Sequence, residues 1–337
     1  MTAQPGNRRA TVTDVAAAAG VSVATVSRVV NGVPTVDPAL VERVHQAIVD
    51  CGYILNPTGR ALRRRVSAMW RVIIPDLQNP FFIGVVSAIE GIAVRHNSSI
   101  VLSDSDEHVD RERQAIDAAI GEQVAGVIIA CASESRSNVQ PLADAGIPVV
   151  MIDRRNRGYH GDAVYVDNHR AGALAAEHLL KRGYRRLACI AGSADVTATE
   201  DRLAGFRSTL AQRGIALPEA YVRRTDRRID RGDEALRDLM TLPEPPDALY
   251  VTNEPVTAGV YQAAQELGLR MPNDIALVAT DDAPWMRMVR PGVTTVSQPV
   301  EQIGTVAAEM IASRVAGTEG PRGTVILAPE LRVRASA

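Results

Sequence analysis

Residues 11–31, TVTDVAAAAGVSVATVSRVVN, have the pattern of two short helices joined by a tight turn. Thr13 is predicted to cap the first helix, with the Asp14 carboxylate favourably placed near the positive end of that helix. Gly20 is predicted to end it, because glycine adopts the left-handed cap conformation without steric cost. Ser22 then caps the second helix. Apolar residues recur at the spacing of one helix face, as Val15, Ala16 and Ala19 and then as Val26, Val29 and Val30.

This layout predicts a helix-turn-helix, in which the second helix enters the DNA major groove. The second helix carries four residues away from its apolar stripe, namely Val23, Ala24, Ser27 and Arg28. An alanine-rich helical hairpin inside a larger core is the alternative, and it explains the alanines but not the turn and the polar face together. We therefore interpret the segment as part of a DNA-binding head.

A third helix completes the predicted head, which spans residues 1–56. Asp37 and Pro38 supply an N-cap and a proline at the first helical position. The apolar stripe of this helix is Leu40, Val44, Ala47 and Ile48, and Gly52 follows its end. Three such helices bury little surface, so we expect a marginally stable unit, preceded by ten polar residues that are disordered without DNA.

Charge is distributed unevenly along the 337 residues, although the formal net charge is only −2. Residues 1–66 contain eight arginines and four carboxylates, a balance of +4, which leaves −6 for the remainder. A basic end on an acidic body suits phosphate binding by that end alone. The length allows two or three domains, and 46% hydrophobic residues are ordinary for a globular protein.

The sequence carries no signal for export, membrane insertion or catalysis. It has no apolar leader segment and no stretch as long as a membrane span, which predicts a cytoplasmic protein. Cys51, Cys131 and Cys189 lack metal or redox spacing and are expected to be small buried side chains, and the six histidines are expected to be solvated. Phosphate-loop, nucleophile-elbow and metal-binding motifs are missing, so we predict no enzyme, no cofactor and no metal.

Residues 57–68 are predicted to link the head to the rest of the chain. The segment PTGRALRRR, residues 57–65, begins with helix-capping chemistry, but Gly59 weakens a helix and Leu62 is its only large apolar side chain. Such a short helix does not persist in water without packing. Two interpretations stay open, namely a basic linker and a hinge helix that forms on DNA and inserts Leu62 into the minor groove.

From Arg71 onward, short apolar strands alternate with amphipathic helices. Strands are predicted at 71–75, 99–103, 125–130, 147–152, 187–191, 247–252, 275–280 and 293–297. Helices are predicted at 83–95, 111–121, 168–181, 233–241 and 256–267. This alternation predicts parallel, doubly wound sheets covered by helices on both faces, and the length indicates two such units.

Polar and aromatic residues follow the ends of the predicted strands, where open parallel sheets bind their ligands. These residues are Asn79, Phe81, Phe82, Asp153, Arg154, Arg202, Asn253, Asp281 and Gln298. Each alone is more often a helix cap or an ion-pair residue. Together, their amides, carboxylates and guanidinium groups match the alternating donors and acceptors of a polyol, and the aromatic rings match its C–H surface.

From Thr11 to about Arg334 the chain resembles the lactose-repressor/galactose-repressor (LacI/GalR) family of bacterial transcription regulators. The most specific segments are TVTDVAAAAGVSVATVSRVVNG, NPTGRALR and PDLQNPFF. The resemblance implies a small all-α head and hinge helix joined to a two-lobed, periplasmic-binding-protein-like α/β domain. It further implies a homodimer on a pseudo-palindromic double-stranded DNA operator, and a small-molecule effector, a sugar, between the lobes.

The resemblance also assigns residues to DNA. Val23, Ala24 and Arg28 would contact base edges, with Arg28 suited to guanine and the small side chains to thymine methyl groups. Leu62 would be the minor-groove wedge. The full expected set is Thr13, Ser22, Val23, Ala24, Thr25, Ser27, Arg28, Asn31, Asn56, Arg60, Leu62 and Arg63.

The nine strand-end residues match positions that sugar-binding relatives use, but two segments depart from the family pattern. Asn253-Glu254-Pro255 replaces the usual Asn-Asp, and Ala279-Thr280-Asp281 replaces Gly-Phe-Asp. Trp285 is expected to lie over the cleft. These departures leave the particular sugar open.

We predict a cytoplasmic, homodimeric transcriptional repressor whose operator affinity an effector controls. The predicted body is residues 69–337, with one lobe at 69–167 plus 298–327 and the other at 168–297 plus the C-terminal segment. No heptad helix follows Arg334, which favours a dimer. The alternatives are a cytoplasmic solute-binding protein and a doubly wound enzyme with a basic N-terminal tether.

Overall fold

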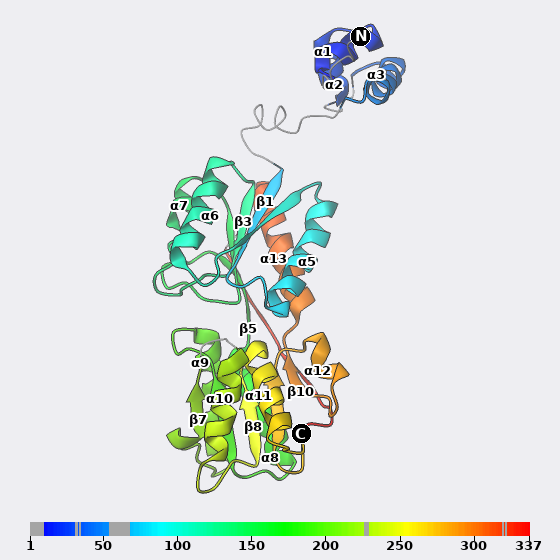
Figure 1. Ribbon diagram of the computed structural model, residues 1–337. Helices are drawn as coiled ribbons and strands as arrows, with labels where there is room; N and C mark the ends of the chain where they lie inside the picture. The colour runs from blue at the N-terminus through cyan, green and yellow to red at the C-terminus, as the bar shows by residue number, and fades with distance from the viewer. Residues whose placement is uncertain are drawn as a thin grey trace, which may run out of the picture. The chain divides into compact units, whose positions relative to one another are not determined.

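The computed structural model describes residues 10–30, 33, 35–53, 68–225, 229–318, 320 and 322–337 (Figure 1). The chain divides into two compact units, Met1–Arg65 and Val66–Ala337. All but the last residue of the predicted 57–68 hinge lies outside the described residues. So do five of the predicted DNA contacts, namely Asn31, Asn56, Arg60, Leu62 and Arg63.

The head contains the three predicted helices. They are α1 (Val12–Ala19), α2 (Val23–Val30) and α3 (Pro38–Asp50). The side chains of Val15, Val26 and Val44, one from each helix, are fully buried and form the centre of a small apolar core. The apolar stripes therefore face one another, as their spacing predicts.

The first helix begins earlier than the sequence prediction placed it. Thr11, not Thr13, is the N-cap: its Oγ1 accepts from Asp14 N at 3.4 Å, and Asp14 Oδ2 accepts from Thr11 N at 2.7 Å. This capping box satisfies two free N–H groups reciprocally, and Thr13 lies inside the helix instead. The prediction for Thr13 as a cap was wrong.

The other helix ends of the head are confirmed. Gly20 ends α1 in the left-handed conformation, with φ of 63°. Ser22 Oγ accepts from Thr25 N at 3.1 Å, and Asp37 Oδ1 accepts from Ala39 N at 2.7 Å. These bonds satisfy N–H groups that the first turn of α2 and of α3 would otherwise leave free.

The body contains two six-stranded sheets. The first consists of β1 (Met69–Ile74), β2 (Ser99–Asp104), β3 (Gly126–Ile129), β4 (Val149–Ile152), β5 (Asp162–Val166) and β11 (Thr324–Leu327). Its strands are all parallel, in the order β11-β5-β4-β3-β1-β2. The second consists of β6 (Leu187–Ala191), β7 (Val222–Arg224), β8 (Ala248–Val251), β9 (Ala276–Thr280), β10 (Thr294–Ser297) and β12 (Glu330–Arg332). Its order is β12-β10-β9-β8-β6-β7, and only β12 is antiparallel to its neighbour.

Helices cover both faces of each sheet. Four helices pack on the first sheet: α5 (Pro80–Arg95), α6 (Val109–Gly121), α7 (Gln140–Asp144) and α13 (Val300–Val315). Five helices pack on the second sheet: α8 (Asn168–Lys181), α9 (Thr197–Gln212), α10 (Ile229–Met240), α11 (Glu254–Glu266) and α12 (Pro284–Met288). Successive residues of a central strand enter different cores: Val72 faces α5 and α13, and Ile73 faces α6 and α7. This two-sided burial explains why the strands are continuous apolar runs.

We call the first sheet with its helices the N-lobe and the second the C-lobe. The chain passes between the lobes three times, after β5, after β10 and after β11. Because β5 leads directly into α8 and β10 leads into α13, the carboxyl edge of each sheet faces the other lobe (Figure 1). The predicted strand ends therefore meet between the lobes.

Every predicted strand is present, but several elements escaped prediction. These are β5, β7, β11, β12, α7, α9, α12 and α13. Among the described residues no single helix is long and apolar enough to cross a membrane, although the bent pair Val12–Ala19 and Val23–Val30 passes that test by length and composition together.

Candidate ligand cleft and DNA-binding face

A cavity of about 1460 Å³ lies between the carboxyl edges of the two sheets. All nine predicted strand-end residues line it: Asn79, Phe81, Phe82, Asp153, Arg154, Arg202, Asn253, Asp281 and Gln298. They come from six different segments, so the fold brings together residues separated by more than 200 positions. This volume is ample for a small polar molecule.

On the N-lobe wall, Asn79 and the two phenylalanines begin α5. Asn79 Oδ1 accepts from Phe81 N at 3.0 Å, so this amide caps the helix as well as facing the cavity. The rings of Phe81 and Phe82 meet edge to face, with centroids 5.0 Å apart. Phe82 is only 1% exposed and packs mainly into the N-lobe core, which leaves Phe81 as the more accessible ring.

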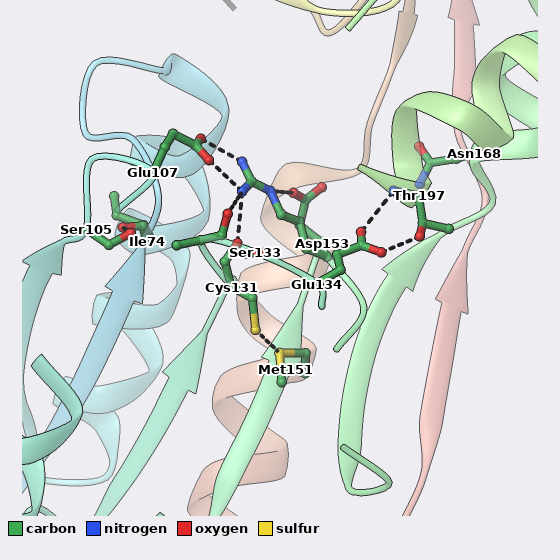
Figure 2. Close-up of polar contacts among 12 residues, drawn as sticks. Ile74, Ser105, Glu107, Cys131, Ser133, Glu134, Met151, Asp153, Asn168 and Thr197 are labelled. Atoms are coloured by element: carbon green, nitrogen blue, oxygen red, sulfur yellow. Dashed lines mark hydrogen bonds and ion pairs between the residues drawn. The ribbon is translucent and has the colours of Figure 1, made fainter. Parts of the chain in front are cut away.

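Arg154 is the most deeply buried charge of the cavity wall, at 1% exposed. Its Nη2 and Nη1 donate to the two carboxylate oxygens of Glu107, at 2.7 Å and 2.8 Å, and Nη1 also donates to Cys131 O at 2.9 Å (Figure 2). Burial acts to lower the pKa of Arg154, but the bonds and charge of Glu107 outweigh it and the pKa is raised. Glu107 therefore holds the buried guanidinium of Arg154 through a bidentate contact.

Four of the cavity carboxylates have a strained backbone with positive φ, and they include Asp106 at 47° and Glu107 at 60°. Asp153 follows β4 with φ of 59°, and Asp281 follows β9 with φ of 73°, both in the left-handed region that residues other than glycine seldom adopt. Such backbone strain clusters at binding sites, where the surrounding structure holds it in place. Asp153 and Asp281 lie on opposite lobes and line the same cavity.

Glu134, which follows β3, connects the lobes. Its Oε1 accepts from Thr197 N at 3.0 Å, and its Oε2 accepts from the Thr197 hydroxyl (Figure 2). Thr197 begins α9, whose N-cap Val196 offers no side-chain bond. A carboxylate of the N-lobe thus caps a helix of the C-lobe, where the positive end of the helix favours it.

On the C-lobe wall, Arg202 and Asn253 are held by the protein itself. Arg202 Nε donates to Asn168 Oδ1 at 2.7 Å, and its Nη1 donates to Thr252 O at 2.8 Å. Asn253 Oδ1 accepts from Val256 N at 3.1 Å and caps α11. Both residues therefore have structural roles in addition to facing the cavity.

Asp281 and Gln298 form a buried pair beside the crossing segment after β10. Gln298 Nε2 donates to Asp281 Oδ1 at 2.7 Å. Burial raises the pKa of Asp281, and the charge of Asp153 raises it further against Arg202, which lowers it. Gln298 Oε1 is buried and has no hydrogen-bond donor within the described part of the chain.

Glu254 occupies the position where the sequence departs from the family pattern. It is 7% exposed, lines the cavity, and its Oε1 accepts from Trp285 Nε1 at 2.5 Å. Burial raises the pKa of Glu254. Trp285 itself does not line the cavity but packs on Tyr261, with ring centroids 5.9 Å apart. The expectation that Trp285 covers the cleft was wrong, because its indole is turned to Glu254 and the C-lobe core.

Sequence reasoning missed Glu107 and Glu134. Both follow strands, β2 and β3, at the carboxyl edge of the first sheet, so the strand-end argument was available for them. The prediction that all histidines are solvated was also wrong for His178, which is buried in α8. No cluster of three or more histidine, cysteine, aspartate or glutamate side chains in the described ranges has a metal-binding arrangement.

In the head, the predicted base-reading residues lie on one face of α2. Val23 is 43% exposed, and Ala24 and Arg28 are exposed as well. Thr25 and Ser27 are half-buried, and Thr13 is exposed on α1. Their positions follow helical spacing opposite to the buried Val26 and Val29, which leaves a continuous face for a partner.

The two units define a class: a helix-turn-helix carried on a two-lobed, periplasmic-binding-protein-like domain. Residues 11–56 match the model of bacterial regulatory proteins of the lacI family. Residues 176–337 match the model of the periplasmic binding protein-like domain.

Curated relatives match nearly the whole chain. Catabolite control protein A of Priestia megaterium is 32% identical over 302 residues, 89% of this chain and 91% of that protein. The ribose operon repressor of Halalkalibacterium halodurans is 33% identical over 308 residues, 90% of each chain.

Solved structures of transcription regulators are similar to this chain over nearly its whole length. The Lac repressor dimer bound to operator and an anti-inducer has a TM-score of 0.88 at 25% identity, covering 98% of this chain and 99% of that one. The regulator CelR in complex with cellobiose has a TM-score of 0.74 at 29% identity, covering 98% of this chain and 100% of that one. The chain belongs to the lacI family of bacterial regulatory proteins. It is a sequence-specific DNA-binding transcriptional regulator.

Proposed function

We propose that this regulator is a repressor that binds a pseudo-palindromic operator as a homodimer and releases or tightens its hold when a sugar enters the interlobe cavity. The observation that carries the proposal is the convergence of all nine strand-end residues on one cavity, in a chain that also carries a DNA-binding head. The similar ribose operon repressor and cellobiose-bound regulator support a sugar as the effector. We assign it no catalytic activity and place its action in the cytoplasm.

The proposed mechanism is linkage between the two lobes. Three chain crossings and the Glu134–Thr197 contact join them, so a ligand that touches both walls favours one lobe separation over another. Operator affinity then changes by the ratio of effector affinities for the two conformations, and operator binding changes effector affinity by the same factor.

The proposed DNA contacts follow the exposed face of α2. Arg28 is assigned to guanine through a bidentate contact, and Val23 and Ala24 to thymine methyl groups. Ser22, Thr25 and Ser27 are assigned to the phosphate backbone, and Thr13 of α1 belongs to the proposed DNA-contacting set. The assignments of Asn31, Asn56, Arg60, Leu62 and Arg63 concern residues outside the described ranges and rest on the family pattern alone.

The decisive experiment is a fluorescence-anisotropy titration of the full chain against the DNA upstream of its own gene, at two salt concentrations, with and without pentoses and hexoses. Tight, sequence-preferring binding that one sugar shifts supports the proposal. Sequence-specific binding that no sugar changes discards the effector class. Binding without sequence preference would reduce the head to a basic tether.

A further inference from the structure

Carboxylates greatly outnumber cations on the walls of the interlobe cavity. Ten acidic side chains line it, against three arginines. The acidic residues are Asp76, Asp106, Glu107, Glu134, Asp153, Asp195, Asp233, Glu254, Glu266 and Asp281. Four of the ten, Asp106, Glu107, Asp233 and Glu266, are ion-paired with arginines. The six that remain still exceed the other cations of the wall, and a concave, partly dry surface focuses such an imbalance, so the cavity favours donors and cations over anions.

The arginines of the inner cavity are already engaged. Arg154 is neutralised by the bidentate pair with Glu107 and further bonded to Cys131 O (Figure 2). Its Nε, which is buried without a hydrogen bond among the described residues, lies 3.9 Å from Asp153 Oδ2. Arg202 donates its Nε hydrogen bond to Asn168 Oδ1 and its Nη1 hydrogen bond to Thr252 O. Arg136, the third, is exposed. A phosphate site normally presents to the anion a guanidinium or ammonium group that has no other partner. Neither arginine of the inner walls has a pair of N–H groups available for such a bidentate contact.

The carboxylates deepest in the C-lobe wall, by contrast, are held by neutral donors. Asp281 accepts from the Gln298 amide, and Glu254 accepts from the Trp285 indole. Asp153 lines the same cavity from the N-lobe. Since like charges in a low-dielectric site interact strongly, a further negative group placed among these three carboxylates is penalised.

The side chain of Gln298 independently favours a ligand that donates hydrogen bonds. Gln298 is 6% exposed and lines the cavity, and its Oε1 is buried without a donor among the described residues. Its Nε2 faces the Asp281 carboxylate, so Oε1 is the acceptor that remains. An unsatisfied buried acceptor is costly, and a ligand hydroxyl or ammonium group would satisfy it, whereas phosphate oxygens cannot donate when ionised.

We infer that the effector is a donor-rich polyol without negative charge, neutral or amino-substituted, and that Glu254 excludes phosphorylated sugars from the cavity. This inference rests on the proposed sugar-responsive function and narrows its ligand. Glu254 acts as a specificity residue: the Trp285 indole holds one of its oxygens and thereby fixes the carboxylate on the cavity wall.

Matched ligand pairs test the inference. Calorimetric titrations of the full chain would compare D-ribose with ribose 5-phosphate and D-glucose with glucose 6-phosphate, with glucosamine as the cationic probe. In whichever pair binds, the free sugar is expected to bind at least about tenfold more tightly than its phosphate, which corresponds to about 1.4 kcal/mol. Glu254→Gln, nearly isosteric, is expected to narrow that ratio, while Glu90→Gln on the exposed face of α5 leaves it unchanged.

The outcomes separate the inference from the proposed function. If a phosphate binds as tightly as its parent sugar or more tightly, and shifts operator binding, the inference is overturned while sugar control stands. A ratio that Glu254→Gln leaves unchanged overturns the role of Glu254. If no compound of the panel binds, sugar control is lost and the inference with it, although operator binding by the head remains measurable.

Discussion

Arg28 is the single side chain on which the proposed operator specificity depends most. It is exposed on α2 beside the small residues Val23 and Ala24. Arg28→Ala is expected to weaken operator binding by about 1–3 kcal/mol and to relax the preference at one base pair per half-site. Anisotropy with operators substituted one base pair at a time measures this. An equal loss on every sequence would instead make Arg28 a phosphate contact.

His178 is the buried exception among the six histidines, and it makes the stability of the body depend on pH. Burial lowers its pKa, and Arg182 and Lys181 lower it further, against a hydrogen bond with the Ala337 backbone. Because the folded-state pKa lies below the unfolded value of about 6.5, the unfolded chain binds the proton first. The stabilisation is therefore fully present above about pH 6.5 and is lost as the pH falls from that value through the lower pKa of the folded state.

The test for His178 is a series of urea unfolding curves from about pH 8 to about pH 5.5. The midpoint is expected to fall with pH, and His178→Leu is expected to flatten the change. His160→Leu, at an exposed histidine, serves as the control. If His178→Leu keeps the full dependence on pH, other groups are responsible.

At the scale of single elements, the cap of α1 decides where the recognition motif begins. Thr11→Ala removes the Oγ1 that accepts from Asp14 N and donates to Asp14 Oδ2, while the backbone N–H of residue 11 keeps its Asp14 acceptor, and the change is expected to destabilise the head by about 1 kcal/mol. Thr13→Ala, inside the same helix, is the matched control and is expected to have little effect on stability. Hydrogen exchange of amides in α1 and α3 of the full chain measures both. The opposite ranking would contradict the capping box.

Helix pairs in the C-lobe approach closely because glycine lies between them. A Cβ atom at Gly172 of α8 would lie 1.8 Å from Arg202 O, and one at Gly205 of α9 would lie 1.9 Å from His169 O. Gly172→Ala is therefore expected to destabilise the chain by at least about 1–3 kcal/mol, as overpacked sites do, and to displace Arg202 from the cavity wall.

Gly91→Ala in α5 is the control for Gly172→Ala, since nothing lies within 4 Å of its added Cβ atom. It is expected to be neutral, or to stabilise the chain by about 0.5–1 kcal/mol. Denaturant curves distinguish the two variants. If Gly172→Ala were as stable as Gly91→Ala, the close approach of α8 and α9 would not hold in solution.

For the body as a whole, the contact between Glu134 and Thr197 biases the lobes toward the separation seen here. Glu134 is 7% exposed, and hydrogen bonds to buried charged groups contribute about 1.5–3 kcal/mol. Glu134→Ala is therefore expected to change effector affinity about tenfold or more, because it removes a contact that joins the lobes at the separation of this structure.

A double-mutant cycle isolates that interlobe contact. Glu134→Ala and Thr197→Val each remove one partner, and the double variant is expected to be no worse than the more damaging single one. Glu90→Ala, at an exposed glutamate of α5 that does not line the cavity, is the control. Effector titrations in the presence and absence of operator provide the readout. Strictly additive effects would show that the two residues act independently.

Most of the architecture was predictable from the sequence because its signals are local. Capping residues, the left-handed Gly20 and the helical stripes predict the head, and apolar runs predict the central strands. Eight of the nine cavity residues follow soon after a strand, and Arg202 lies further along in α9. Because parallel strands end together, their positions predicted that the residues of each lobe would gather at the carboxyl edge of its sheet. The sequence did not predict elements that are short or only partly amphipathic, such as β7 and β12, because their apolar pattern is weak.

The tertiary structure alone decided which partners these residues meet. Arg154 is paired with Glu107 from 47 positions away, and Glu134 reaches Thr197 across 63 positions and between lobes. The tertiary structure also decided that His178 is buried. It likewise placed the Trp285 indole so that it donates to Glu254, 31 positions away, instead of covering the cavity. Helical and strand periodicity describe only neighbours along the chain, whereas charge pairing and burial depend on side chains that folding brings together from distant segments.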